Sequence, residues 1–337
     1  MRVHRLQTTD AFIAFDFDCP VSGGGTRLAP DVSEEEVKLL ARAMSYKFAV
    51  LGARLGGAKA AIRARPEERR EAISRYCAEI LPLVRSRRFL TSTDLGTYPE
   101  DFAALPEAES PNPGVELTMT GLGVVVAAEV ALGGLEGARI ALEGFGKVGG
   151  ATAEAAAARG ARLVAVSTVH GCVRRPDGFD AGELLALRER HGDRLVEHVG
   201  TELLPPGALY ETPADVLVPG ARTGSLDDER AARVPARVVA PAANVPYTEA
   251  GLRALAGRGV LALPDFVCNC GATLSYLAPA GSGEAAVAEL VESTVADLTR
   301  RSLAHPDGPF AGGCAVAEEF LRTWVDAEQV PARPPLA

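Results

Sequence analysis

The pattern of apolar and polar positions along the chain predicts an α/β protein. Apolar runs of strand length occur at residues 11–18, 89–93, 139–143, 162–167, 216–218, 237–240 and 260–263. Helical periodicity marks residues 34–47, 66–84, 120–132, 284–304 and 315–325, together with an Ala-rich stretch that ends at Gly160. Because strands alternate with helices in the second half, we expect a mostly parallel, doubly wound sheet there.

Glycine runs and one proline-rich stretch interrupt this pattern in the first third of the chain. Residues 20–27 contain three consecutive glycines and predict a turn after the first strand. Residues 56–61 are all small except Lys59 and predict a loop. The length of 337 residues allows two domains, and the Pro-rich residues 106–117 predict the crossing between them.

Composition and charge argue against several kinds of partner. The net charge of −9 and the pI near 5.2 do not suit nucleic acid or an anionic membrane surface. No stretch approaches the ~20 apolar residues of a membrane helix. Asp16 and Asp18 interrupt the apolar start, so we expect no signal peptide. The six cysteines form no CxxC pair and no zinc spacing with the five histidines, which predicts free thiols in a reducing cytoplasm and no metal site.

Lysine is rare in this chain. Among 35 basic residues there are only four lysines, at positions 38, 47, 59 and 147. A buried lysine can lose its proton near neutral pH and act as a base, whereas arginine cannot. Lys47 and Lys59 are therefore candidate site residues. Alternatively, Lys47 ends an exposed helix face and the glycines before Lys59 form a plain helix C-cap.

A glycine pattern follows the predicted strand at residues 139–143 directly. Gly144, Gly146 and Gly149 match GxGxxG between a strand and an Ala-rich helix, which is the setting of a dinucleotide pyrophosphate site. The alternative is a glycine-rich turn in an unrelated α/β sheet. No acidic residue ends the next strand, at Ser167 and Thr168, and three basic residues follow at positions 170, 174 and 175. The sequence therefore leaves both NAD and NADP open.

Nine short segments, in order along the chain, carry a resemblance to a known family. They are GGTR at 24–27, MSYK at 44–47, GGAK at 56–59, DLGT at 94–97, TGLG at 120–123, GFGKVG at 144–149, ADVLVP at 214–219, AN at 243–244 and NCG at 269–271. Together they resemble the Glu/Leu/Phe/Val family of amino acid dehydrogenases, closest to its leucine, phenylalanine and valine type.

The resemblance implies a reaction and three roles. The reaction is the NAD(P)-dependent, reversible oxidative deamination of an L-amino acid to a 2-oxo acid and ammonia. The residue matching Lys47 would hold the substrate α-carboxylate, the one matching Lys59 would act as base, and the one matching Asp94 would shuttle a proton. These residue types suit the roles, because an anionic substrate needs a fixed cation and a base needs an amine whose pKa is lowered by burial.

The resemblance also implies a domain division. Residues 1–118 would form an α/β substrate and dimerisation domain, completed by C-terminal helices at 305–337. Residues 119–304 would form a Rossmann-type NAD(P)-binding domain, and a cleft between the two would close to exclude water. The expected assembly is a homo-oligomer, a dimer or larger, although a chain shorter than most relatives leaves the large oligomers of the family in question.

Further site residues follow from the same resemblance. The expected substrate contacts are Lys47, Gly23, Gly24, Asn269 and Ser275. The expected NAD or NADP contacts are Thr120, Gly144, Gly146, Lys147, Val148, Gly149, Ser167, Thr168, Ala221, Asn244 and Asn269. The alternatives are structural: Asp94, Asn244 and Asn269 as turn residues, Gly24 as a purely backbone requirement, and Lys147 as a solvent-facing side chain.

The chain departs from the family pattern where substrates are distinguished. Glutamate dehydrogenases carry a lysine at the position of Gly23, so glutamate is disfavoured, an apolar or aromatic side chain is preferred, and a deeper pocket is expected there. Against this, residues 120–123 and Ser275 look glutamate-like. The segment 269–275 is one residue short, which suits a non-standard amino acid. A non-catalytic nucleotide-binding regulatory protein is the alternative from another class.

Overall fold

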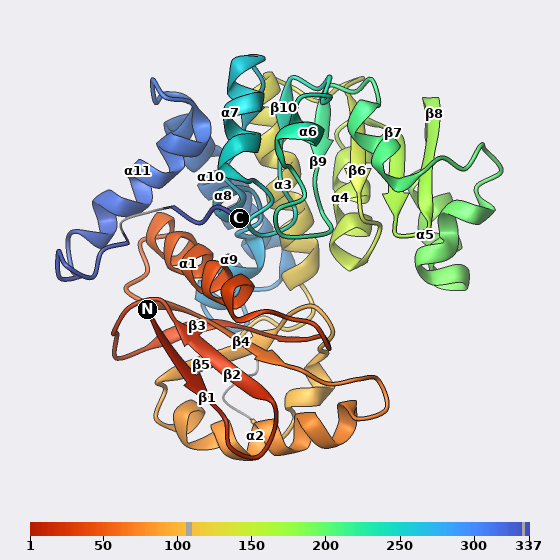
Figure 1. The fold of residues 1–337 in the computed structure, drawn as a ribbon. Helices are drawn as coiled ribbons and strands as arrows, with labels where there is room; N and C mark the ends of the chain where they lie inside the picture. The colour runs from red at the N-terminus through yellow and green to blue at the C-terminus, as the bar shows by residue number, and fades with distance from the viewer. Residues whose placement is uncertain (106–109, 332–333) are drawn as a thin grey trace. The chain divides into compact units, whose positions relative to one another are not determined.

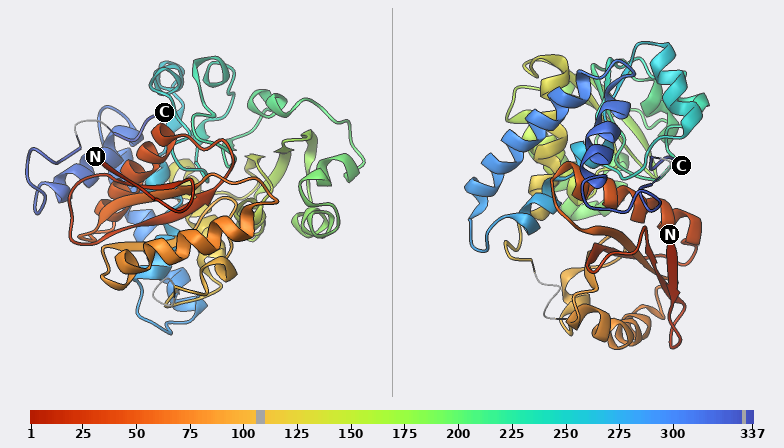
Figure 2. Two further views of the ribbon diagram at one scale, coloured as in Figure 1. Left: turned by 60° about the horizontal axis from the view of Figure 1, so that its bottom comes forward. Right: turned by 90° about the vertical axis from the view of Figure 1, so that its left-hand side faces the viewer.

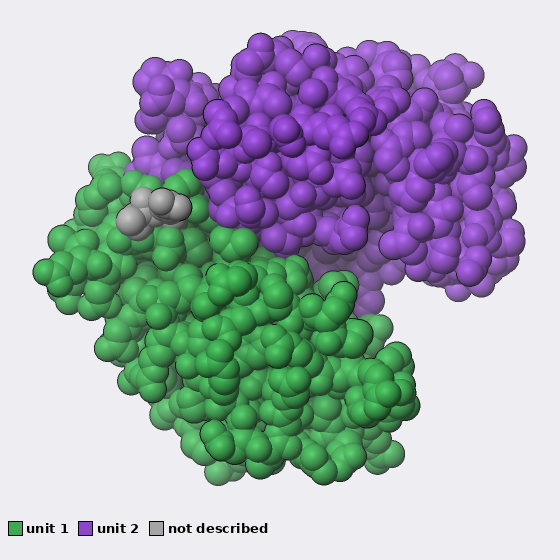
Figure 3. All heavy atoms as spheres, viewed as in Figure 1, with its two compact units in different colours: residues 1–113, 317–335 green, residues 114–316, 336–337 purple. Residues whose placement is uncertain are grey.

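The computed structural model describes residues 1–105, 110–331 and 334–337 (Figure 1). They form two compact units, coloured separately in Figure 3. Unit 1 comprises Met1–Pro113 and Ala317–Pro335, and unit 2 comprises Gly114–Val316 and Leu336–Ala337. The two units meet in the chain at 113/114 and 316/317. The sequence predicted these domain boundaries at 118/119 and 304/305. Residues 106–109 of the predicted Pro-rich crossing lie outside the described residues.

Unit 1 is built on a five-stranded mixed sheet. Its strand order is β1 (Arg2–Arg5), β2 (Ala11–Phe15), β4 (Gly56–Ile62), β3 (Ser22–Leu28) and β5 (Phe89–Thr93). The strands β1, β2 and β4 pair antiparallel, whereas β3 pairs parallel with both β4 and β5. The strand predicted at residues 89–93 is confirmed, and it ends where Asp94 begins.

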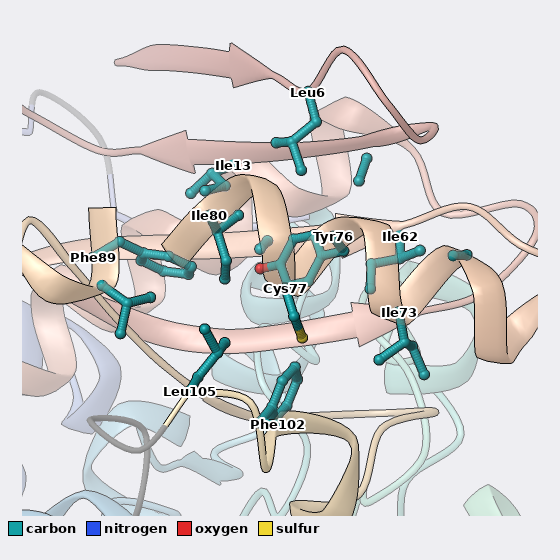
Figure 4. Packing of buried hydrophobic residues seen from close by; sticks show 14 of the residues in the cluster. Leu6, Ile13, Ile62, Ile73, Tyr76, Cys77, Ile80, Phe89, Phe102 and Leu105 are labelled. Atoms are coloured by element: carbon teal, nitrogen blue, oxygen red, sulfur yellow. The ribbon is translucent and has the colours of Figure 1, made fainter. Parts of the chain in front are cut away.

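Two helices cover opposite faces of this sheet, as Figures 1 and 2 show. Helix α2 (Arg69–Arg85) packs Ile73 and Ile80 into one core with Ile13 and Phe89 (Figure 4). Helix α1 (Glu34–Val50) places Val37 and Ala41 in a second core, together with Phe12, Ala14 and Ala61. Neighbouring strand residues divide between the two cores because side chains alternate across a strand. A short η1 helix (Pro99–Phe102) borders the α2 core.

The two glycine runs of unit 1 are strands, which corrects the predicted turn at 20–27 and the predicted loop at 56–61. Glycine usually weakens a strand, but here the neighbouring backbone leaves no room for a side chain. A Cβ on Gly57 would lie 2.1 Å from the carbonyl oxygen of Ala41 on α1. A Cβ on Gly25 would lie 2.7 Å from the carbonyl oxygen of Thr93 on β5. Close packing, rather than chain reversal, explains these glycines.

Unit 2 contains the doubly wound sheet that the sequence predicts. Its strand order is β11 (Leu261–Ala262), β10 (Val238–Val239), β9 (Val216–Val218), β6 (Arg139–Glu143), β7 (Arg162–Thr168) and β8 (Gly171–Phe179). All neighbours pair parallel except β7 and β8, which are antiparallel. The sequence did not reveal β8, because this edge strand carries charged residues and a proline instead of an apolar run.

Helices surround the sheet of unit 2. They are α3 (Glu116–Leu132), α4 (Lys147–Ala157), α5 (Ala181–His191), η3 (Gly192–His198), η4 (Pro206–Glu211), α6 (Asp228–Ala231), α7 (Glu249–Gly257), α8 (Asp265–Cys268), α9 (Gly271–Leu277), α10 (Glu284–Leu303) and the first part of α11 (Pro309–Leu321). Helix α11 begins six residues before the predicted start at 315. Among the described residues, no helix combines the length and apolar character that a membrane crossing requires.

Candidate active site

Lys59 lies in the middle of β4 and points to the α1 side of the sheet. Its neighbours Ala58 and Ala60 belong to the core under α2, so Lys59 faces the other way, as Ala61 does. Its side chain is only 3% exposed, and its Nζ lies 2.8 Å from Oδ1 of Asp94. The lysine and the aspartate singled out from the sequence therefore form a buried ion pair.

Gly25 makes this ion pair possible. Strand β3 lies between β4 and β5, so the side chains of Lys59 and Asp94 must meet across it. A Cβ on Gly25 would come within 3.0 Å of the Asp94 Cβ. The missing side chain leaves the space in which the two charged groups meet.

Hydrogen bonds fix the loop that carries Asp94. The Asp94 amide donates to Oγ1 of Thr97 at 2.9 Å, and that hydroxyl donates to the carbonyl oxygen of Thr26 at 2.8 Å. Gly96 has a φ of +78°, and a Cβ there would lie 2.1 Å from the carbonyl oxygen of Leu28. Asp94 is thus part of a turn, as the structural alternative held, and it is also paired with charged side chains.

The surroundings shift the pKa of both groups. Burial lowers the pKa of Lys59, and the Arg27 guanidinium acts in the same direction, while Asp94 opposes it. Burial alone would raise the pKa of Asp94, but the positive charges of Lys59 and Arg27 hold it well below its usual range. The site therefore combines an amine that gives up its proton more readily than usual with a firmly anionic carboxylate.

Sequence reasoning missed two charged residues of this site. Arg27 on β3 donates from Nε to Oδ2 of Asp94 at 2.9 Å and from Nη1 to Oε1 of Glu36 at 2.7 Å. Glu36 lies in the first turn of α1, where its amide donates to Oγ of the N-cap residue Ser33. The Glu36 carboxylate binds Arg27. Arg27 belonged to a recognised motif, but nothing in the sequence tied it to Asp94.

Lys47 lies in the last turn of α1, on the side of the sheet to which Lys59 points. The residue is 6% exposed, so it does not end an exposed helix face. The glycines before Lys59 are strand residues, so they do not form a helix C-cap either. The structural alternatives for both lysines are excluded.

In unit 2, residues 144–149 form an open turn between β6 and α4. Gly144 has a φ of +81°, and a Cβ on Gly149 would lie 2.1 Å from the Gly144 carbonyl oxygen. Gly146 is the N-cap of α4, where no side-chain hydrogen bond is made, and apart from its own local backbone and chain neighbours no atom of the described residues lies within 4 Å of where its Cβ would be. The exposed Lys147 and the half-buried Val148 follow at the start of the helix. Free space beside uncapped helix amides suits a pyrophosphate.

The end of β7 offers hydroxyl groups, and its basic neighbours are engaged elsewhere. Ser167 is buried, and Thr168 Oγ1 accepts from the His170 amide at 3.2 Å. The His170 ring lies 3.2 Å from Asp193 and 4.0 Å from Glu197. The other two basic candidates also have partners: Arg174 donates to the carbonyl oxygen of Ala208, and Arg175 donates to Glu183.

The predicted asparagines meet at the carboxyl side of the sheet. Asn269 Nδ2 donates to Oδ1 of Asn244 at 3.1 Å, and it also reaches the carbonyl oxygens of Ala242 and Ala243. Its own Oδ1 is buried and, among the described residues, has no hydrogen-bond partner. A buried acceptor without a donor is costly, so it marks a place where a ligand can donate a hydrogen bond.

Helix α3 approaches the same place. A Cβ on Gly271 would lie 1.8 Å from the carbonyl oxygen of Met119, so α9 touches α3 beside Thr120. The Thr120 hydroxyl donates to the Glu116 carbonyl at 2.8 Å, and the Ser275 hydroxyl donates to the Ala272 carbonyl at 2.7 Å. Both hydroxyl protons stay within their own helices. Of the remaining candidates, Ala221 donates its amide to Glu143 at 3.4 Å.

Two family models match this chain. The Glu/Leu/Phe/Val dehydrogenase dimerisation domain matches residues 6–109, and the Glutamate/Leucine/Phenylalanine/Valine dehydrogenase model matches residues 114–296. The chain belongs to this family. It is an NAD(P)-dependent amino acid dehydrogenase, an oxidoreductase with the two-domain α/β fold that the sequence resemblance implied.

Individual relatives agree with the family assignment. A glutamate dehydrogenase of Aeropyrum pernix is 32% identical over 278 residues, which are 74% of this chain and 66% of the relative. One from Thermotoga maritima is 32% identical over 286 residues, 75% of this chain and 68% of the relative. The aligned part thus spans about two thirds of the length of these relatives.

Solved structures share the fold. The hetero-hexameric glutamate dehydrogenase of Thermus thermophilus, in its leucine-bound form, superimposes with a TM-score of 0.81 at 26% identity, covering 93% of this chain and 83% of that chain. An L-tryptophan dehydrogenase of Nostoc punctiforme gives 0.66 at 22% identity over 96% and 97%. At that identity the second likeness shows the fold alone.

This dehydrogenase differs from the expectation at Gly23. A Cβ on Gly23 would lie 2.9 Å from the tip of the Phe48 ring. The ring, 6% exposed, fills the space that the missing side chain would leave, so the deeper pocket expected at Gly23 is a wrong prediction. Backbone packing requires a glycine at position 24, because a Cβ there would lie 1.7 Å from the Ala58 carbonyl oxygen.

Metal-binding groups do not gather in the dehydrogenase. Among the described residues, no three His, Cys, Asp or Glu side chains are placed to hold a metal ion. All six cysteines are buried free thiols.

Proposed function

We propose that this dehydrogenase catalyses the reversible oxidative deamination of an L-amino acid with an apolar or aromatic side chain, using NAD. The observation that carries the proposal is the ion pair between Lys59, buried on β4, and Asp94, which follows β5 and also binds Arg27. Burial lowers the pKa of Lys59. A neutral amine held beside an anion can take a proton from water at a pH where a free lysine cannot.

Three residues of unit 1 have roles in the proposed reaction. The Lys47 ammonium binds the substrate α-carboxylate. The neutral Lys59 amine removes a proton from the water that attacks the imino carbon, and the Asp94 carboxylate passes protons to and from the substrate nitrogen. The nicotinamide ring, when bound, accepts the hydride from the α-carbon. The products are the 2-oxo acid, ammonium and the reduced cofactor.

The cofactor is assigned to unit 2. The amides at the start of α4 and the open space at Gly146 receive the pyrophosphate. Asn269, with its unpartnered Oδ1, and its neighbour Asn244 receive the carboxamide of the nicotinamide. Thr120 lies beside Gly271, two residues after Asn269.

We assign NAD rather than NADP because of the end of β7. Thr168 offers a hydroxyl to a ribose. Its basic neighbour His170 is held by Asp193 and Glu197, which bring negative charge close to where a 2′-phosphate would lie. Repulsion between these carboxylates and a phosphate favours the cofactor that lacks it.

Phe48 supports an apolar substrate side chain. In glutamate dehydrogenases a lysine at the position of Gly23 meets the second carboxylate of the substrate, whereas here an aromatic ring occupies that space. A second carboxylate would lose its hydration against the ring without gaining a cation. Glutamate remains the second candidate, because the Aeropyrum and Thermotoga relatives carry that name and Ser275 fits the glutamate-type pattern of the family resemblance.

A turnover panel tests the proposal. NADH or NADPH formation is followed for each L-amino acid, and for common non-standard ones, with both cofactors at pH ~10, where the substrate amine is neutral. We expect turnover with leucine, valine, phenylalanine or tryptophan and NAD. Turnover with glutamate alone would contradict the Phe48 argument. Cofactor binding without turnover on any substrate would favour a regulatory protein.

Cell compartment and assembly complete the proposal. We place the enzyme in a reducing cytoplasm, for which its cysteine pattern is suited. We also propose a homo-oligomer, since residues 6–109 match a dimerisation domain. Analytical ultracentrifugation of the purified chain tests this, and a monomer at micromolar concentration would exclude it.

A further inference from the structure

Four charged side chains of unit 1 form one continuous chain of contacts. Glu36 on α1 accepts from Arg27 at 2.7 Å, Arg27 donates to Asp94 at 2.9 Å, and Asp94 lies 2.8 Å from Lys59. Glu36 at the outer end is 30% exposed, Arg27 and Asp94 are 13% and 15% exposed, and Lys59 at the inner end is 3% exposed. Two acids and two bases thus alternate from the edge of α1 to the buried amine.

We propose that Arg27 and Glu36 are positioning residues that set how readily Lys59 takes up a proton: Arg27 opposes protonation, and Glu36 offsets Arg27. This inference rests on the proposed role of Lys59 as the base. It assigns a function to two residues that contact neither the substrate carboxylate nor the cofactor in the proposed mechanism.

The argument begins with the charge beside Asp94. Asp94 alone would hold a proton on Lys59, because a buried anion at 2.8 Å strongly favours the ammonium form. Arg27 binds the other carboxylate oxygen and shares that negative charge. The net charge next to Lys59 is thereby reduced, and the neutral amine becomes accessible.

Glu36 acts in the opposite sense. Its carboxylate binds the far side of the same guanidinium, so Arg27 is shared between two anions. Without Glu36, no second anion would offset the positive charge of Arg27, which would then act more strongly on Asp94 and Lys59. The directions of the pKa effects agree with this geometry, since Arg27 lowers the pKa of Lys59 and Glu36 raises it.

Other charges near Lys59 are accounted for. On α1, which packs against β4, Arg42 is ion-paired with Asp16 at 2.6 Å, and Lys47 is the proposed substrate ligand. The charged groups with the strongest effect on Lys59 are Asp94, Arg27 and Glu36. Changing Arg27 or Glu36 is therefore the direct way to change the proton affinity of Lys59.

The rarity of lysine gives a direct measurement. With only four lysines in the chain, a protein labelled with ¹³C at the lysine Cε gives few NMR signals, and Lys59→Met assigns the one of interest. The signal is titrated in the wild type, in Glu36→Gln and in Arg27→Gln. The signal of Lys147, in unit 2, is the internal control and should be the same in all three proteins.

The two variants should move Lys59 in opposite directions. We expect a Lys59 midpoint about one pH unit lower in Glu36→Gln and about one pH unit higher in Arg27→Gln. Arg27→Lys, which keeps a positive charge, should bring the midpoint back towards the wild type. Shifts in the same direction, or no shift in either variant, would overturn the proposal, since a purely structural role predicts no opposed pair.

Two further readouts protect the test. If Arg27→Gln does not fold, Glu36→Gln decides alone, and an unchanged or raised midpoint refutes the proposal. For an active substrate, the acid limb of kcat/KM should move with the NMR midpoint, because the titration of the substrate amine is common to all variants. The NMR needs no substrate, so opposed shifts without any turnover would retain this proposal's electrostatics and refute the proposed function instead.

Discussion

The two glycine-rich regions of this dehydrogenase read alike in the sequence and do different work. In unit 1, Gly25 and Gly57 lie within strands, and each lacks a side chain because a neighbouring backbone already occupies its place. In unit 2, Gly146 precedes a helix, and apart from its own local backbone and chain neighbours no atom of the described residues lies within 4 Å of its missing Cβ. One set of glycines packs the protein against itself, and the other leaves space.

This difference divides the proposed chemistry between the units. The tight strands of unit 1 bring Lys59 and Asp94 across β3 into a buried ion pair. The open turn of unit 2 exposes helix amides to a ligand. A change in the strands should therefore affect stability and catalysis, whereas a change in the turn should affect cofactor binding. The following substitutions test that division.

The largest effect is expected from removing the base. Lys59→Ala should lower kcat by about 10³-fold or more, within the range for lost acid–base catalysis, because the other buried lysine of unit 1, Lys47, is assigned to the substrate carboxylate. Its NADH affinity, measured by fluorescence titration, should stay within about 2-fold of the wild type, since unit 2 is untouched. The matched control is Lys38→Ala, on the outer surface of α1. A Lys59→Ala enzyme with full rate would refute the mechanism.

The next effect is on stability. Gly57→Ala puts a methyl group within 2.1 Å of the Ala41 carbonyl oxygen and 2.3 Å of the Ser45 amide, both backbone atoms of α1. Overpacking of this kind should cost about 3 kcal/mol of unfolding free energy. Urea unfolding measures this loss of stability. Gly259→Ser is not a suitable control, because the φ of +71° at this surface turn would itself strain the new side chain. Gly207→Ala is the suitable control, because apart from its own local backbone and chain neighbours no described atom lies within 4 Å of where its Cβ would be.

Gly146→Ala makes the opposite prediction. The substitution should leave the free energy of unfolding within about 0.5 kcal/mol of the wild type, because the new methyl group meets no described atom. It should weaken NADH binding by about 10-fold, since the methyl group enters the space needed for the close approach of the pyrophosphate. An unchanged NADH affinity together with a lower free energy of unfolding would contradict the prediction, because Gly146 would then serve packing rather than cofactor binding.

The smallest effect is expected at Lys147. This exposed residue begins α4, so its charge adds to the amides that face the pyrophosphate. Lys147→Ala should weaken NADH binding only about 3-fold at low salt, and the difference should shrink at 0.5 M salt because exposed charges are screened. A salt-independent loss of 100-fold would show that Lys147 is a buried phosphate ligand once the cofactor is bound.

Much of the architecture could be predicted because local patterns carry it. Strands β5 and β6 begin and end at the predicted residues, since short apolar runs between turn signals specify a strand locally. Strands β3 and β4 could not be predicted, because their glycines are required by close contacts with the backbone of elements distant in the sequence. The edge strand β8 could not be predicted either, because it carries charged residues and a proline instead of an apolar run.

The candidate site shows the same limit. Lys59 stood out through the rarity of lysine, and the family resemblance assigned Lys59 and Asp94 to one reaction, but their ion pair was not predicted. Arg27 is 67 positions from Asp94, and no local rule links them. Phe48 follows a recognised motif directly, but its role depends on a ring tip placed against Gly23 on another element. Contacts between distant segments are what the structure adds.

The most direct test of the account is a crystal structure of the enzyme with NADH and the 2-oxo acid of its best substrate, without ammonia so that no turnover occurs. The account predicts the α-carboxylate about 3 Å from Lys47 Nζ, the 2-oxo carbon beside Lys59 and Asp94, and the side chain against Phe48. A 2-oxo acid bound with its carboxylate away from Lys47, or with Lys59 out of reach of the 2-oxo group, would contradict it.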